Sequence, residues 1–132
     1  MGAWGTGSFE NDDASDWVYD LEGSTDASVV RAALTLVATA GDDAYVERPE
    51  AACAIAAGEV VAAATGSPGP QLPEDVGRWL GLHGASITED LRELAVRGVT
   101  RARAKSELRE LWDEAGDEEW LALTADLLGR LA

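Results

Sequence analysis

The sequence predicts an all-α fold, an irregular or orthogonal bundle of about six to seven helices that follows an ordered N-terminal arm. Apolar residues recur at the i, i+3, i+4, i+7 spacing of a helix from Asn11 to the C-terminus. Glycines separate these repeats, and no stretch alternates apolar and polar residues as a half-buried strand would. Because the helices are short and closely connected, we expect crossed packing and not a long coiled coil.

The N-terminal arm, residues 1–9, contains three glycines and the large aromatic residues Trp4 and Phe9. Glycine permits tight backbone turns, and the two rings have a large apolar area to bury. We therefore expect an ordered arm whose rings dock on the helices.

Three helices are expected before the proline-rich segment: one over residues 12–22, one that starts near residues 24–26 and ends at 41, and one from 49 to about 65. Asn11 or Asp12 can cap the first helix by accepting a hydrogen bond from a free backbone amide. Gly23 and Gly41 are expected to end the first two helices in the left-handed conformation. The third begins at Pro49 and is nearly apolar on all sides, which is typical of a buried central helix.

Residues 66–73 hold three of the four prolines and predict a stiff loop between two helical halves. Neither half has enough apolar stripes to close a core alone, so we expect a single helical domain over residues 1–132. Four helices are expected after the loop, with apolar faces that contain Val76, Trp79 and Leu80; Ile87, Leu91, Leu94, Ala95 and Gly98; Leu108, Leu111 and Trp112; and Trp120, Leu123, Leu127, Leu128 and Leu131.

Charge excludes some partners. The 25 acidic residues outnumber the 10 basic ones, which gives a net charge of −15. A field of this sign repels polyanions, so we expect no nucleic-acid and no membrane partner. The single cysteine, Cys53, is expected to be a small buried residue in a reducing compartment, and no secretion or membrane segment is recognised. We expect a cytoplasmic protein.

The first seventeen residues, MGAWGTGSFENDDASDW, resemble the start of a bacterial family known only as a domain of unknown function. The likeness continues through residues 51–64 with Glu59, through 70–73 and through 106–112, and so covers most of the chain. The resemblance implies a small uncharacterised cytosolic protein and carries over no activity, cofactor or catalytic residue.

The first predicted helix carries several acids. Asp13, Asp16 and Asp20 share one side of it, with Asp12 beside them. A cation could bind there, but hard cations need converging oxygens from a shaped loop. A solvated acidic face at a helix start is the simpler interpretation.

Glu59 is a single carboxylate in an otherwise apolar helix. Burial there requires either a raised pKa or a basic or hydrogen-bonding partner. We expect a structural ion pair, with Arg31 or Arg97 as the candidate partner, although a catalytic or ligand-binding role remains open.

Six of the ten basic residues lie between positions 92 and 109. Arg97 and Arg101 belong to this group, which is expected to be a solvated face that pairs with nearby glutamates. It is also the best local surface for an anion or an acidic partner, and head-to-tail self-association is possible.

No catalytic constellation, cofactor motif or metal-ligand set is recognised, and His83 is the only histidine. The sequence favours a small acidic module that binds another protein without catalysis, and an antidote or immunity-type protein is one version. The alternative is a small enzyme or ligand-binding protein that uses a pocket near Glu59. The candidate functional residues are Glu59, Trp4, Asp12, Asp16, Arg97 and Arg101.

Overall fold

The computed structural model describes residues 3–132 and confirms an all-α fold. Met1 and Gly2, which begin both the arm and the family-like signature, lie outside the described residues. Across residues 3–132 there is no strand, only an isolated antiparallel bridge between Ala3 and Asn11. The elements are α1 (Asp12–Glu22), α2 (Ser28–Ala38), α3 (Arg48–Ala64), α4 (Glu74–His83), a 3-10 turn η1 (Gly84–Ser86), α5 (Glu89–Ala104), α6 (Glu107–Ala115) and α7 (Glu118–Leu131).

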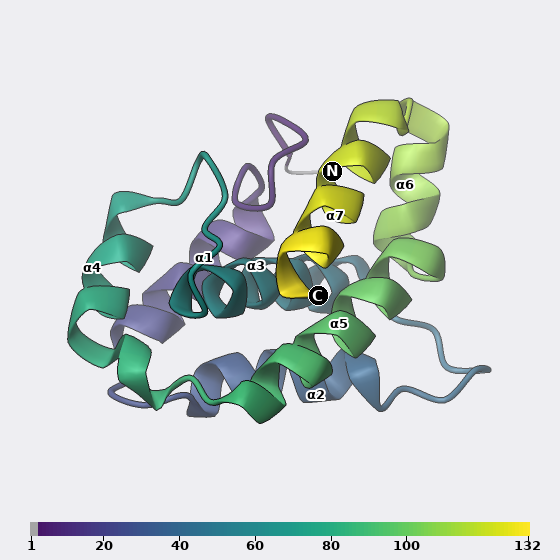
Figure 1. Ribbon diagram of the computed structural model, residues 1–132. Helices are drawn as coiled ribbons and strands as arrows, with labels where there is room; N and C mark the ends of the chain where they lie inside the picture. The colour runs from purple at the N-terminus through teal and green to yellow at the C-terminus, as the bar shows by residue number, and fades with distance from the viewer. Residues whose placement is uncertain (1–2) are drawn as a thin grey trace.

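Helix α3 runs through the middle of the molecule, with α4 at one end and α6 at the other (Figure 1). It contacts α1, α2, α4, α5, α6 and α7, and nearly all of its residues from Ala51 to Ala62 are buried. Gly58 allows this crowding, because a Cβ atom there would lie only 2.7 Å from Cγ2 of Val99 on α5. The prediction of a central buried helix is confirmed.

Helices α2 and α5 also approach closely. A Cβ atom at Gly98 would lie 3.3 Å from the carbonyl oxygen of Leu34. The structure therefore confirms that Gly98 permits the close approach of a neighbouring helix.

Helices from the two sides of the 66–73 loop pack against each other. Helix α3 contacts helices on both sides of the loop, and α1 contacts α4. The indole Nε1 of Trp79 on α4 also donates a hydrogen bond to the carbonyl of Ser24 at 2.9 Å. The two halves share one cluster of buried apolar side chains.

The helix ends agree with the sequence in part. The side chains of Asn11 and Ser106 accept hydrogen bonds from backbone amides and cap α1 and α6. The prediction that Gly23 ends α1 in the left-handed conformation is wrong. Its φ of −77° is right-handed, and its amide donates to carbonyls of the preceding turn.

The predicted end of the second helix at Gly41 is also wrong. Helix α2 ends at Ala38, and the backbone amide of Thr39 donates to the carbonyl of Thr35. The start is later than predicted, at Ser28, whose amide donates to Asp26 Oδ1 at 2.9 Å. Within the described chain only Gly66 and Gly116 have positive φ values.

Residues 3–9 of the arm have a defined conformation, as predicted, but the two rings of the arm differ in burial. The Trp4 amide donates to the Glu10 carbonyl, and the Gly7 amide donates to Oε1 of Glu10, each at 3.0 Å. Phe9 packs on the core, whereas Trp4 is 62% exposed, so the prediction that both rings dock is wrong for Trp4. Backbone bonding and glycine turns around the Glu10 carboxylate hold the arm without that indole.

Within residues 3–132, no helix has the length and apolar character needed to cross a membrane.

Candidate functional site

Glu59 is buried and forms an ion pair with Arg130. Nη1 and Nη2 of Arg130 donate to Oε1 and Oε2 of Glu59 at 2.9 and 3.2 Å. The structural ion pair is as predicted, but the suggested partners are wrong: Arg31 pairs with Asp90, and Arg97 is exposed on α5. Helix α7 packs beside α3 and brings its last turn to Glu59.

Further polar groups surround this pair. Ser8 Oγ of the arm donates to Glu59 Oε2 at 2.8 Å, and Nε of Arg130 donates to Asp126 at 2.8 Å. Burial alone would lower the pKa of Arg130, but its bonds to Glu59 and Asp126 outweigh burial and raise that pKa. The pair thus joins the arm, α3 and α7.

A cavity of about 190 Å³ lies against the ion pair, and we call it the α3–α7 cavity. Glu59 and Arg130 form part of its wall, and the arm, the 66–73 loop and α7 supply the rest. Glu59 therefore both belongs to an ion pair and lines a pocket, so it combines the two alternatives that the sequence left open.

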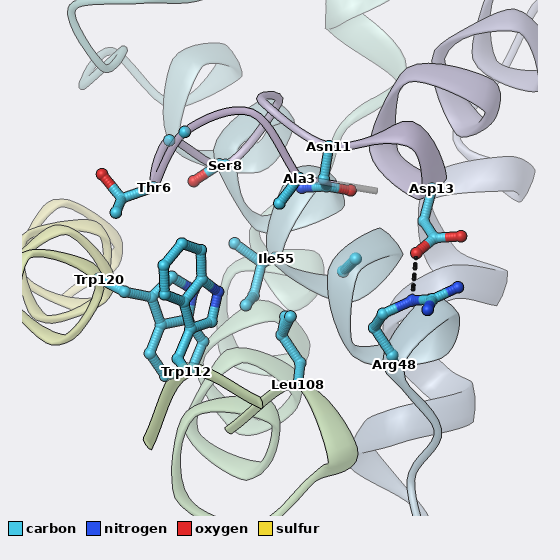
Figure 2. Close-up of a pocket in the computed structure, with 13 residues that line it drawn as sticks. Ala3, Thr6, Ser8, Asn11, Asp13, Arg48, Ile55, Leu108, Trp112 and Trp120 are labelled. Carbon is cyan, nitrogen blue, oxygen red and sulfur yellow. Dashed lines mark hydrogen bonds and ion pairs between the residues drawn. The ribbon is translucent and has the colours of Figure 1, made fainter. Parts of the chain in front are cut away.

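A second hollow lies under the arm, between Asn11 and the helices below it. Figure 2 shows the arm crossing above Ile55, with the rings of Trp112 and Trp120 on one side and the Asp13–Arg48 ion pair on the other. The two rings stack with centroids 6.4 Å apart. The hollow under the arm has a volume of about 20 Å³, which holds about one water molecule, so this hollow is too small for an organic ligand.

The acidic face of α1 is exposed at Asp12 and Asp16. Asp13 is turned to Arg48, whose Nε donates to it at 2.9 Å. In the part of the chain that the structure describes, no group of three or more His, Cys, Asp or Glu side chains is arranged to hold a metal ion.

An open apolar groove of about 760 Å³ lies between α1, α2 and the start of α3, and we call it the α1–α2 groove. Tyr19 and Leu36 line it with exposed fractions of 72% and 55%. Its other lining residues are Trp17, Asp20, Gly23, Ser24, Val29, Ala32, Ala33, Pro49, Glu50 and Cys53. Burial, followed by the charges of Asp13, Asp20 and Asp16, raises the pKa of the Cys53 thiol to about 11.

The basic region is largely engaged in internal bonds. The guanidinium of Arg101 donates to the carbonyls of Ala40 and Ala44 at 2.9 and 2.8 Å and so supports the α2–α3 connection. Arg103 Nε donates to Thr124 on α7, and Arg109 pairs with Asp113 and Asp117. The two bonds of Arg101 to the α2–α3 connection give this residue a structural role.

The structure does not gather the sequence candidates into one site. Glu59 lines the α3–α7 cavity, whereas Trp4, Asp12, Asp16, Arg97 and Arg101 line none of the three hollows described. The sequence pattern does not single out Arg130, Tyr19 or Leu36. Tyr19 and Leu36 could have been noticed as large apolar residues off the predicted inward faces of their helices.

The fold and these sites define an all-helical protein with a buried Glu59, paired with a partly buried Arg130 beside a cavity, and an exposed apolar groove on its acidic side. The chain belongs to the family described as a domain of unknown function, DUF4259, which it matches over residues 2–122. No curated protein and no solved structure matches it.

Proposed function

We propose that this protein is a non-catalytic cytoplasmic binding module whose α1–α2 groove holds a basic amphipathic helix of a partner protein. The observation that carries the proposal is the exposure of Tyr19 and Leu36 on a continuous apolar groove. Large apolar side chains grouped at the surface in this way are typical of protein interaction sites.

The shape of the groove favours a helical partner. Val29, Ala33 and Leu36 follow one another along α2 at helical spacing, and Trp17 and Tyr19 come from α1. An amphipathic helix presents anchors at i, i+3, i+4 and i+7, which suits a groove lined by residues of two helices at such spacing.

The charges around the groove favour a basic partner. Helix α1 contains five acidic residues and no basic one, and Asp20 and Glu50 line the groove itself. The charges of Asp13, Asp16 and Asp20 contribute to the raised pKa of Cys53 in its wall, so their negative potential reaches the groove. A second copy of this chain, with its net charge of −15, would be repelled.

A narrower form of the proposal makes the protein an antidote or immunity-type protein that covers the basic surface of a toxin. The net charge of −15 supports this form. Opposite charge would also speed the encounter with such a partner.

Affinity capture from the native lysate with Leu36→Ser tests the groove. The control is Leu82→Ser, because Leu82 is 73% exposed on α4 and does not line the groove. We expect wild type and Leu82→Ser to recover the same protein and Leu36→Ser to lose it. A synthetic peptide of the recovered protein's basic amphipathic segment should bind with the same pattern, and more weakly at high salt.

Three results would overturn the proposal: no specific protein is recovered, the recovered protein has no basic amphipathic segment, or Leu36→Ser binds as well as wild type. Circular dichroism of both variants establishes that the loss of binding is not a loss of fold.

A further inference from the structure

The α3–α7 cavity has the size of a site for a small organic molecule. Its volume is about 190 Å³. An apolar protein cavity of about 150 Å³ accommodates benzene, so there is room here for one aromatic ring or a short aliphatic chain with a polar end. Phe9, Leu72 and Leu123 supply apolar wall from the arm, the loop and α7.

The charged wall of the cavity is strongly negative. Glu10, Glu59, Glu119 and Asp126 line it together with one cationic residue, Arg130. The guanidinium is shared between Glu59 and Asp126, so its single charge cannot balance both of them. Glu119, in the first turn of α7, is exposed and adds a further carboxylate.

We infer that the α3–α7 cavity binds a small organic cation, an amine or guanidinium carried on an aromatic or short aliphatic body. The cationic group donates hydrogen bonds to the carboxylates, with Glu119 as the main acceptor outside the ion pair. The apolar body lies against Phe9, Leu72 and Leu123. This site is separate from the α1–α2 groove, with which it shares no lining residue.

The same walls disfavour two other classes of ligand. An anion would meet four carboxylates and a guanidinium that is already bonded to two of them. A hard metal ion needs several converging oxygens, but both oxygens of Glu59 accept from Arg130 and the apolar wall offers no ligand.

The Glu59–Arg130 pair gives the cavity a fixed back wall. Ser8 ties the arm to Glu59, and the Arg130 guanidinium also donates to the Ser67 carbonyl of the loop at 3.2 Å. Three of the segments that bound the cavity are thereby held to one ion pair, so little ordering is required when a ligand enters.

Titration of the purified protein with benzylamine and butylamine, followed by amide NMR, tests the inference. Benzoate and butyrate are the matched anions. We expect saturable shifts with the two amines, with Kd values of about 0.1–10 mM, and we expect them on residues of the arm, the loop and α7. We expect no saturable shift with the two carboxylates.

Glu119→Gln and Glu118→Gln provide a matched pair of variants. Both remove one acid from the first turn of α7, but only Glu119 lines the cavity. Glu119→Gln should weaken amine binding by about two- to fivefold, as expected for loss of one partly exposed charge pair, and Glu118→Gln by less. Leu123→Trp, which fills the cavity, should abolish binding.

The inference is overturned if neither amine gives saturable shifts, if benzoate binds as well as benzylamine, or if the shifts map outside the cavity. Equal effects of Glu118→Gln and Glu119→Gln would also overturn it, because they would show nonspecific attraction to an acidic protein.

Discussion

Arg130 and Glu59 form a bidentate pair that ties the last turn of α7 to the C-terminal half of α3. The side chains are 17% and 11% exposed, and their two N–O distances are 2.9 and 3.2 Å. Burying a carboxylate alone is costly, so this pair is what makes Glu59 tolerable within an apolar helix.

Replacement of Arg130 by Met should therefore destabilise the protein. The change leaves the Glu59 carboxylate without its cation, and we expect a loss of about 2–4 kcal/mol in the free energy of unfolding, since the pair retains some exposure. Urea denaturation measures this loss. The double variant Glu59→Leu/Arg130→Met should recover most of it, and a double variant as unstable as the sum of the single ones would contradict this account.

Two helical glycines should respond in opposite directions to substitution by alanine. A Cβ atom at Gly58 would lie 2.7 Å from Val99, so Gly58→Ala should cost about 1–3 kcal/mol through overpacking. At Gly77, an exposed position on α4, no atom would lie within 4 Å of an added Cβ, so Gly77→Ala should stabilise by about 0.4–1 kcal/mol.

The same denaturation experiment measures both glycine variants. The double variant Gly58→Ala/Val99→Ala should lose less stability than the sum of the losses of the two single variants. The reason is that Val99→Ala removes the atom with which the new Cβ clashes. If Gly58→Ala were as stable as wild type, the close approach of α3 and α5 would be disproved.

Trp120 should be the more sensitive member of the stacked tryptophan pair. It is 3% exposed, whereas Trp112 is half-buried. Trp120→Ala should cost about 3–5 kcal/mol of stability, and Trp112→Ala less, since it removes less buried area. Trp4→Ala is the control: with 62% of Trp4 exposed, it should change stability by about 0.5 kcal/mol at most. Equal losses at Trp4 and Trp120 would refute the assigned burial.

Much of the fold could be predicted from the sequence, because helix type and inward face follow from local spacing. Ala14, Trp17, Val18 and Leu21 on α1 have the predicted helical spacing and are buried. The helix ends were less predictable. Gly23 has no need of positive φ in this structure, since its amide already bonds within the last turn of α1.

The functional surfaces were harder to predict because they depend on contacts between distant residues. Glu59 stands out locally as a charge in an apolar helix, but Arg130 is 71 positions away and only tertiary packing brings it there. The α1–α2 groove likewise needs the relative placement of α1 and α2, which helical periodicity does not give.

Cys53 should react slowly with thiol reagents despite lying in the wall of an open groove. Burial first, and then the charges of Asp13, Asp20 and Asp16, raise its pKa from 9.0 to about 11. Since the thiolate is the reactive form, the rate with iodoacetamide at neutral pH should be about 100-fold below that of the urea-unfolded chain.

The pH dependence of this reaction gives the sign of the effect. The rate should continue to rise up to about pH 11, whereas that of the unfolded chain levels off near the ordinary pKa of 9.0. Because the folded state binds the thiol proton more tightly, the stability gained from it is complete below about pH 9 and is lost as the pH rises toward 11. Asp20→Asn should shift the pH profile of the folded protein to lower pH. This shift should be smaller than the one caused by unfolding, which exposes the thiol, because burial is the larger cause of the raised pKa. Equal rates for the folded and the unfolded chain at neutral pH would show that Cys53 is neither shielded nor under the negative potential of α1, and would remove one support for a basic partner in the groove.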